Sequence, residues 1–65
     1  ILALPLIELA GHIANLVRPA GNLVLSGILN EQAESVAHAY REQGFRVREP
    51  VSQDDWCRLD AINDK

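Results

Sequence analysis

The sequence predicts the last portion of an open α/β sheet, in the order helix, strand, helix, strand, strand, with an antiparallel hairpin at the end. Three observations support this fold class. Two segments have the apolar period of an amphipathic helix. Between them lies a short continuous apolar run, which is typical of a strand covered on both faces. Beyond the second helical segment the period changes to two, on both sides of a polar turn.

Composition bounds the possible functions. The chain has 65 residues, so it is one small domain or a piece of a larger one. Its 48% hydrophobic and 23% charged residues argue against intrinsic disorder. The net charge of −3 disfavours nucleic-acid binding, because no basic patch is available for phosphates, and the single cysteine excludes a disulfide framework. The sequence contains no Met and starts at Ile1, which we interpret as a cut piece of a longer chain.

The first predicted helix runs from Pro5 to Val17. Pro5 suits the first helical turn, where its missing N–H costs nothing, and Pro19 and Gly21 end the segment. Glu8 interrupts the apolar start far short of the roughly 20 residues that a membrane span needs, and no basic signal-peptide region precedes it. We therefore expect a soluble, cytoplasmic chain with no membrane partner. The apolar stripe of the helix comprises Leu6, Leu9, Ile13, Leu16 and Val17.

The middle of the chain predicts a strand over Leu23–Leu25 and a second helix. For Ser26–Gly27, between them, two interpretations remain open: a simple turn into the helix, or a site where Gly27 permits the close approach of a ligand. Asn30 is the expected N-cap of the helix, and Gly44 is its expected C′ residue. The apolar face of this helix comprises Leu29, Ala33, Val36, Ala37 and Tyr40.

The predicted hairpin consists of a strand over Phe45–Val47, a polar turn over Ser52–Asp55 and a last strand over Trp56–Ile62. Arginine side chains and Pro50 suit the first of these strands to a sheet edge. The last strand has bulky or apolar residues on both sides and no proline. We therefore expect it to lie between the two earlier strands, antiparallel to both.

Chemistry-bearing residues are sparse. The glycine-rich dinucleotide and P-loop motifs are absent. His12 and His38 lack metal-ligand spacing, so we interpret them as surface residues. Cys57 is expected to be a buried structural thiol, and Asp54–Asp55 to be turn formers. We expect Trp56 to be mostly buried, so that Trp56→Ala would lower the free energy of unfolding of the parent domain by roughly 3–5 kcal/mol.

Four stretches, in order and with fitting gaps, are similar to the C-terminal end of one bacterial enzyme family. Ile1–Leu6 resembles the segment directly after that family's motif asparagine, and Leu25–Leu29 resembles its Leu-Ser-Gly-Ile-Leu turn. Gln32–Val36 matches the start of the next helix, and Trp56–Leu59 resembles the Trp-Cys-Arg-Ile of the last strand. Residues 1–65 therefore resemble the C-terminal portion of the catalytic domain in the ribosomal protein L-eleven methyltransferase family.

The resemblance implies a class I, Rossmann-like methyltransferase sheet whose last strand runs antiparallel. It implies methyl transfer from S-adenosylmethionine to lysine and N-terminal amines of a basic ribosomal protein. The family's cofactor motif, acidic ribose-binding residue and motif asparagine would all lie in a missing N-terminal part of the chain. No catalytic, cofactor-binding or metal-binding residue is therefore assigned here. The residues implied at the target amine are Ile1, Leu2 and Ala3, which would flank its pocket, and Ser26, Gly27 and Ile28, which would form the neighbouring wall.

A different class of function stays open, namely a stand-alone αβαββ binding or regulatory module. Such a module would need a stable fold of its own, and the exposed sheet edge that it would leave invites pairing with another strand. The sequence upstream of Ile1 discriminates the two classes. A strand ending in Asn, after a glycine-rich strand–loop–helix, would indicate the enzyme.

The isolated 65-residue chain should neither bind S-adenosylmethionine nor transfer methyl groups, because it lacks the glycine-rich loop and the acidic ribose partner. Isothermal titration calorimetry with the isolated chain measures the binding directly. A micromolar dissociation constant would contradict this prediction and would mean that a cofactor site lies within these residues.

Overall fold

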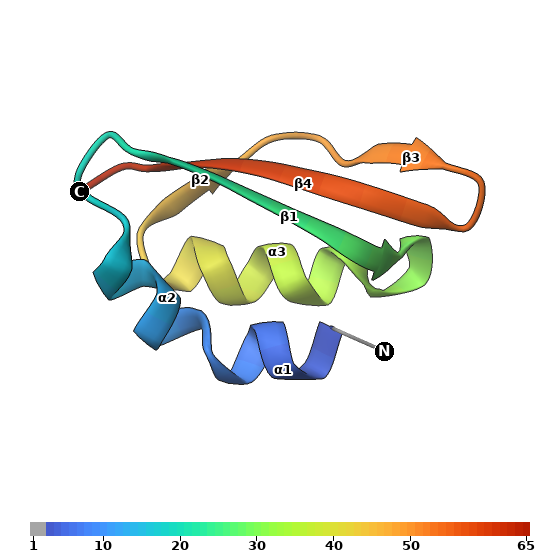
Figure 1. Ribbon diagram of the computed structural model, residues 1–65, viewed down its shortest axis with the longest axis horizontal. Coiled ribbons are helices and arrows are strands. Elements are labelled where there is room, and N and C mark those ends of the chain that lie inside the picture. The colour runs from blue at the N-terminus through green and yellow to red at the C-terminus, as the bar shows by residue number, and fades with distance from the viewer. Residues whose placement is uncertain (1–2) are drawn as a thin grey trace.

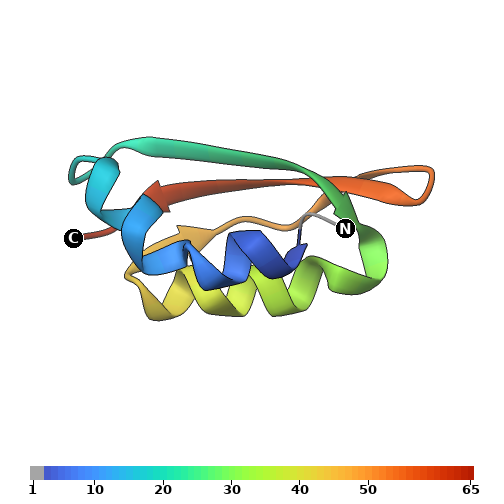
Figure 2. The ribbon, with the colours of Figure 1, turned by 60° about the horizontal axis from the view of Figure 1, so that its bottom comes forward.

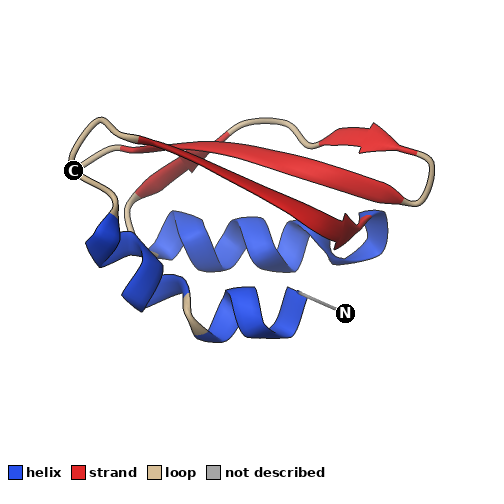
Figure 3. Cartoon of the chain, in the orientation of Figure 1, coloured by secondary structure: helices blue, strands red, loops and turns tan. Residues whose placement is uncertain are grey.

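Helices and strands form separate layers in the computed structural model, which describes residues 3–65 (Figure 1). The helices cover one face of a four-stranded sheet (Figure 3). In chain order the elements are α1 (Ala3–Glu8), α2 (Ala10–Leu16), β1 (Asn22–Leu29), the 3₁₀ turn η1 (Asn30–Gln32), α3 (Ala33–Glu42), β2 (Phe45–Val47), β3 (Val51–Gln53) and β4 (Trp56–Asn63).

Strand β4 lies in the middle of the sheet. The strand order is β1-β4-β2, β3 also pairs with β4, and every pair is antiparallel. Leu25 lies opposite Leu59 in the β1–β4 ladder, and Arg46 lies opposite Ile62 in the β2–β4 ladder. The predicted strand order and the edge position of β2 are thus confirmed. Because β4 is antiparallel to both of its neighbours, β1 and β2 run in the same direction.

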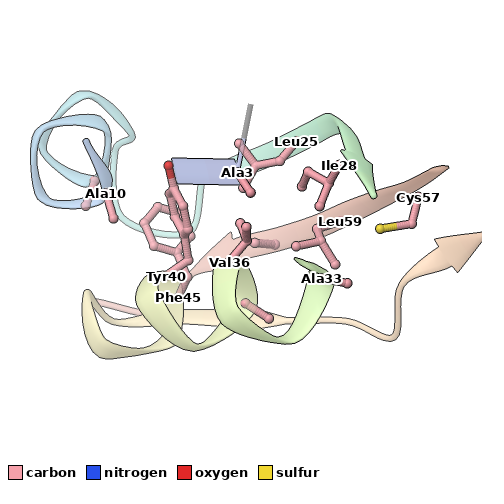
Figure 4. Close-up of a cluster of buried hydrophobic side chains, with 13 residues drawn as sticks. Ala3, Ala10, Leu25, Ile28, Ala33, Val36, Tyr40, Phe45, Cys57 and Leu59 are labelled. Atoms are coloured by element: carbon pink, nitrogen blue, oxygen red, sulfur yellow. The ribbon is translucent and has the colours of Figure 1, made fainter. Parts of the chain in front are cut away.

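The hydrophobic core fills the space between α3 and the inner face of the sheet (Figure 4). Alternation along β4 points Cys57, Leu59 and Ala61 inward, which confirms the predicted burial of Cys57. The other face is uncovered within residues 3–65, and Val24 on that face is 59% exposed. The prediction of a strand covered on both faces is therefore wrong for this part of the chain. The largest fully buried side chains are those of Tyr40, Ile28, Leu59 and Val36.

The first helical segment differs from the single helix that its period predicts. It is interrupted at Leu9 and forms the two short helices α1 and α2. Alanines rather than leucines make the closest contacts, because small side chains let these helices approach the rest of the fold. Leu9 and Leu16 of the predicted stripe are 50% and 73% exposed, whereas Leu6, Ile13 and Val17 pack partly against the core. The buried positions are Ala3, Ala10 and Ala14.

Tyr40 connects α1 to the rest of the core. Its side chain is fully buried, and its hydroxyl donates a hydrogen bond to the Leu6 carbonyl oxygen at 2.9 Å. Leu6 lies three residues before Leu9, where the helix is interrupted. The Tyr40 ring meets the Phe45 ring edge to face, with the ring centroids 6.0 Å apart. Gly44 adopts φ 98° just before Phe45, which confirms its predicted role at the C-terminus of α3.

Asn63, at the end of β4, lies opposite Phe45 in the β2–β4 ladder and closes this end of the sheet. It is buried, and its side-chain amide donates to the Val17 carbonyl oxygen at 2.7 Å. Its backbone N–H donates to the Gly21 carbonyl oxygen at 2.9 Å, and its carbonyl accepts from the Ala20 N–H at 2.7 Å. A buried polar side chain is tolerated because it is hydrogen-bonded. Asn63 therefore joins the end of α2 and the start of β1 to the last strand.

None of the helices in residues 3–65 combines the length and the apolar character that crossing a membrane requires.

Tyr40→Phe should lower the free energy of unfolding by about 0.5–1.5 kcal/mol, the usual contribution of one hydrogen bond, because the ring packing is kept. Burial also raises the pKa of Tyr40 above its ordinary value of about 10. The neutral hydroxyl is thus favoured in the folded state. Its contribution to stability is complete below pH about 10 and is lost as the pH rises through the raised folded pKa.

Urea unfolding at several alkaline pH values measures this effect, and tyrosinate absorbance reports the titration because Tyr40 is the single tyrosine. Tyr40→Phe should abolish the tyrosine-dependent loss of stability above pH about 10. Equal alkaline destabilisation of the two proteins would contradict the assignment to Tyr40.

Candidate functional site

The predicted wall residues lie inside β1 and not in a turn. The strand continues to Leu29, and its pairing register with β4 shifts between Leu25 and Ile28. Gly27 has φ 75° at this shift, a backbone angle that favours glycine. The sequence Ser26–Gly27 therefore forms a β-bulge, which locally bends a strand and re-aims its side chains. The interpretation as a simple turn into the helix is wrong, because a helix begins only after Leu29.

The bulge separates the three wall residues. Ile28 is fully buried and belongs to the hydrophobic core, whereas Ser26 is exposed and Gly27 is half-buried. Ala3 is also buried in the same core cluster as Leu25 and Ile28 (Figure 4). The predicted flanking residues Ile1 and Leu2 lie outside the described residues. Ser26 and Gly27 are therefore accessible to a ligand, whereas Ile28 and Ala3 belong to the core that supports them.

An open hollow of about 390 Å³ lies beside the bulge, between β1 and the β3–β4 hairpin. We refer to it as the bulge hollow. Trp56 on its wall is 49% exposed, so the prediction that it is mostly buried is wrong. The reason is alternation along β4: Cys57 faces the core, so its neighbour Trp56 faces away from the helices. The residues lining the bulge hollow are Ser26, Gly27, Val51, Ser52, Gln53, Trp56, Cys57 and Arg58.

Three of the eight residues that line the bulge hollow belong to a strand that the sequence does not predict. Ser52 and Gln53 are predicted to belong to a polar turn over Ser52–Asp55, but Val51–Gln53 forms the short strand β3. Only Asp54 and Asp55 form the turn, and Asp54 has φ 57°, which confirms their role as turn formers. The sequence signal for this strand is its position, since Val51–Gln53 directly precedes the turn and can pair with the start of the last strand. The ladder confirms this, with Gln53 opposite Trp56.

The predicted cap residue Asn30 connects the end of β1 to this hairpin. Its side chain makes no cap on the following helix. The Asn30 side-chain N–H₂ donates to the Asp54 carbonyl oxygen at 2.8 Å, and its side-chain oxygen accepts from the Ser52 hydroxyl at 3.1 Å. The Asn30 backbone N–H donates to the Asp55 carbonyl oxygen at 2.9 Å. The N-cap prediction is therefore wrong, because the Asn30 side chain bonds to the hairpin and not to the backbone N–H groups at the start of the helix.

Charged groups of both signs lie in and beside the bulge hollow. Arg58 is its single cationic lining residue, and its guanidinium is engaged by Asp60, with Nε and Oδ1 3.1 Å apart. The adjacent turn carries two exposed carboxylates, Asp54 and Asp55. The local arrangement thus combines an aromatic face, hydroxyl and amide groups and a nearby acidic turn.

The histidines lie away from this region. His12 and His38 are exposed, as predicted, and His38 Nε2 lies 3.3 Å from a carboxylate oxygen of Glu42 on the same helix. Cys57 is buried, as predicted for a structural thiol. Residues 3–65 contain no group of three His, Cys, Asp or Glu side chains that could hold a metal ion.

Comparison with known proteins identifies the family. The family model described as "Ribosomal protein L11 methyltransferase (PrmA)" matches residues 1–64. The chain belongs to the ribosomal protein L11 methyltransferase family. This confirms the resemblance seen in the four sequence stretches, and it agrees with an α/β arrangement of helices on an antiparallel sheet.

Curated relatives carry the same name. A ribosomal protein L11 methyltransferase from Hamiltonella defensa is 49% identical over 65 residues, which cover 100% of this chain and 21% of the relative. The one from Glaesserella parasuis is 52% identical over 62 residues, covering 95% and 21%. The one from Marinobacter nauticus is 56% identical over 59 residues, covering 91% and 20%. The chain therefore spans about a fifth of the length of these relatives.

Trp56→Ala should lower the free energy of unfolding by only about 1–2 kcal/mol, because roughly half of the indole already contacts water. Leu59→Ala, three residues along the same strand, should cost about 2–5 kcal/mol because it opens a cavity in the core. Chemical denaturation of the two variants measures the difference. A loss for Trp56→Ala as large as that for Leu59→Ala would mean that Trp56 is a core residue.

Proposed function

We propose that this chain is the C-terminal portion of the catalytic domain of a protein methyltransferase that modifies amines of ribosomal protein L11. In this proposal the bulge hollow receives the side chain that carries the target amine. The observation that carries the proposal is the meeting of the Ser26–Gly27 bulge with the half-exposed Trp56 at one end of the sheet. Ligands of open α/β sheets bind at the carboxyl ends of the parallel strands, and β1 ends beside this hollow.

The chemistry of amine methylation fits a hollow with few charged groups. An ammonium has no lone pair, so the amine must lose its proton before it accepts a methyl group. Trp56 offers a flat apolar surface for the aliphatic stem of a lysine and a favourable face for its cation. The carboxylates of Asp54 and Asp55 attract the charged amine, and the Ser26 and Ser52 hydroxyls offer acceptors near the hollow. These groups bind and orient the amine, and positioning supplies most of the rate enhancement.

S-adenosylmethionine is the methyl donor that the family implies. The residues of this chain do not fit a site for it, since the glycine-rich loop is absent and the hollow is lined by neither Asp nor Glu. We assign cofactor binding to the rest of the enzyme. The described residues then contribute one wall of the amine site and no cofactor contact, and Ala3, predicted to flank the amine, supports that wall from within the core.

The proposed substrate is a basic ribosomal protein, which agrees in sign with the net charge of −3. The proposed location is the cytoplasm, where ribosomal proteins are synthesised and modified. The relatives' names mention ribosomal protein L11, and the choice of lysine and N-terminal amines within it belongs to this proposal.

A chimera tests the proposed function. The aligned segment of the Marinobacter nauticus relative, which is 56% identical, is replaced by this chain. The purified chimera should transfer radiolabelled methyl groups from S-adenosylmethionine to ribosomal protein L11. Trp56→Ala in the chimera should lower kcat/KM by roughly tenfold or more, equivalent to the loss of a favourable stacking contact of about 1.4 kcal/mol.

Val24→Ala is the matched control, because Val24 is exposed on the same sheet but does not line the bulge hollow. It should leave kcat/KM unchanged. A folded chimera without activity would contradict the proposed function, and equal effects of the two substitutions would contradict the placement of the amine beside Trp56.

A further inference from the structure

The tip of the β3–β4 hairpin has little hydrophobic anchoring. All three residues of β3 are exposed, and Trp56 at the start of β4 is half-exposed. The tip lies at the same end of the molecule as η1 in both views of the ribbon (Figures 1 and 2). Burial of apolar surface therefore does little to fix the position of the hairpin tip. Hydrogen bonds between the tip and the rest of the fold carry more of this role.

Asn30 supplies these hydrogen bonds. We call the three bonds from Asn30 to Ser52, Asp54 and Asp55 the Asn30 clamp. They reach across 22 to 25 positions of the chain, so they fix the hairpin relative to β1 and not merely within itself. The clamp begins one residue after Leu29, which lies opposite Trp56 in the β1–β4 ladder. It therefore closes the ladder at the point where Trp56 enters the wall of the bulge hollow.

We propose that Asn30 is a positioning residue of the amine site. It touches neither the hollow nor its ligand. It holds the Asp54–Asp55 turn, and this turn leads directly into Trp56, which lines the same hollow as Ser26 and Gly27. The nature of the ligand rests on the proposed function, whereas the clamp itself is a property of this chain.

The isolated chain tests the clamp without any activity. Trp56 is its single tryptophan, so intrinsic fluorescence reports the position of the hairpin alone. Asn30→Ala should shift the emission to longer wavelength and increase quenching by acrylamide, because the indole becomes more exposed. It should also speed hydrogen exchange of the backbone amide at position 30 by roughly tenfold, the size expected for the loss of two exposed hydrogen bonds.

Two variants control this result. Asn22→Ala removes an exposed asparagine from the other end of β1 and should leave the fluorescence and the exchange at position 30 unchanged. Ser52→Ala removes one of the two side-chain bonds and should give an intermediate effect. A global loss of structure would speed exchange in β4 and α3 as well, whereas the clamp predicts a change confined to the hairpin tip and η1. Unchanged fluorescence and exchange in Asn30→Ala, or a change that is uniform along the chain, would overturn the clamp.

The chimera tests the role in positioning. Asn30→Ala should raise KM for ribosomal protein L11 by roughly tenfold while kcat changes less than about twofold, because the site is formed in a smaller fraction of molecules before binding. Fluorescence that changes while KM and kcat do not would overturn the positioning role. The unsubstituted chimera measures the proposed function separately, so the failure of that proposal is distinct from the failure of this one.

Discussion

Pairing with β4 is the constraint on which the rest of the structure depends. Each of the other strands in the described sheet pairs with β4: β1 along one edge, and β2 and β3 along the other. The alternation of its side chains then divides the molecule. Cys57, Leu59, Ala61 and Asn63 face the helices, and the residues between them face away. Pairing with β1 and β3 fixes the register of β4 at Trp56. Because its neighbour Cys57 faces the core, Trp56 faces the uncovered side of the sheet and is half-exposed.

Much of this arrangement could be predicted because it depends on local patterns and on the properties of sheet edges. The face of α3, the glycine at its end and the alternation of the last strand are all short-range signals. The central position of β4 followed from the contrast between a strand without proline and one limited by Pro50. The burial of Trp56 was predicted wrongly, because the face of the sheet that it occupies is uncovered in residues 3–65.

The features that could not be predicted depend on partners far away in the chain. The period of Pro5–Val17 is continuous, yet the helix is interrupted at Leu9, where the Tyr40 hydroxyl is available to a carbonyl 34 positions away. Asparagine is a common N-cap residue, but the side chain of Asn30 bonds to the hairpin instead of the helix. Ser26–Gly27 is compatible with a turn, and only the ladder with β4 converts it into a bulge. In each case the observed conformation is accompanied by a long-range hydrogen bond, and local sequence patterns do not reveal such bonds.

The two ends of the sheet are therefore held by different forces. At the Asn63 end, polar groups are buried and hydrogen-bonded next to the aromatic pair of Tyr40 and Phe45, so separation would leave them unsatisfied. At the bulge end, the contacts are exposed, and each adds little because water competes for the same groups. Regions that bind ligands are drawn from such less stable parts of a fold. Under the proposed function, the glycine bulge and the exposed hairpin would let the hollow adjust to the long flexible side chain of the substrate, while β4 keeps its walls in register.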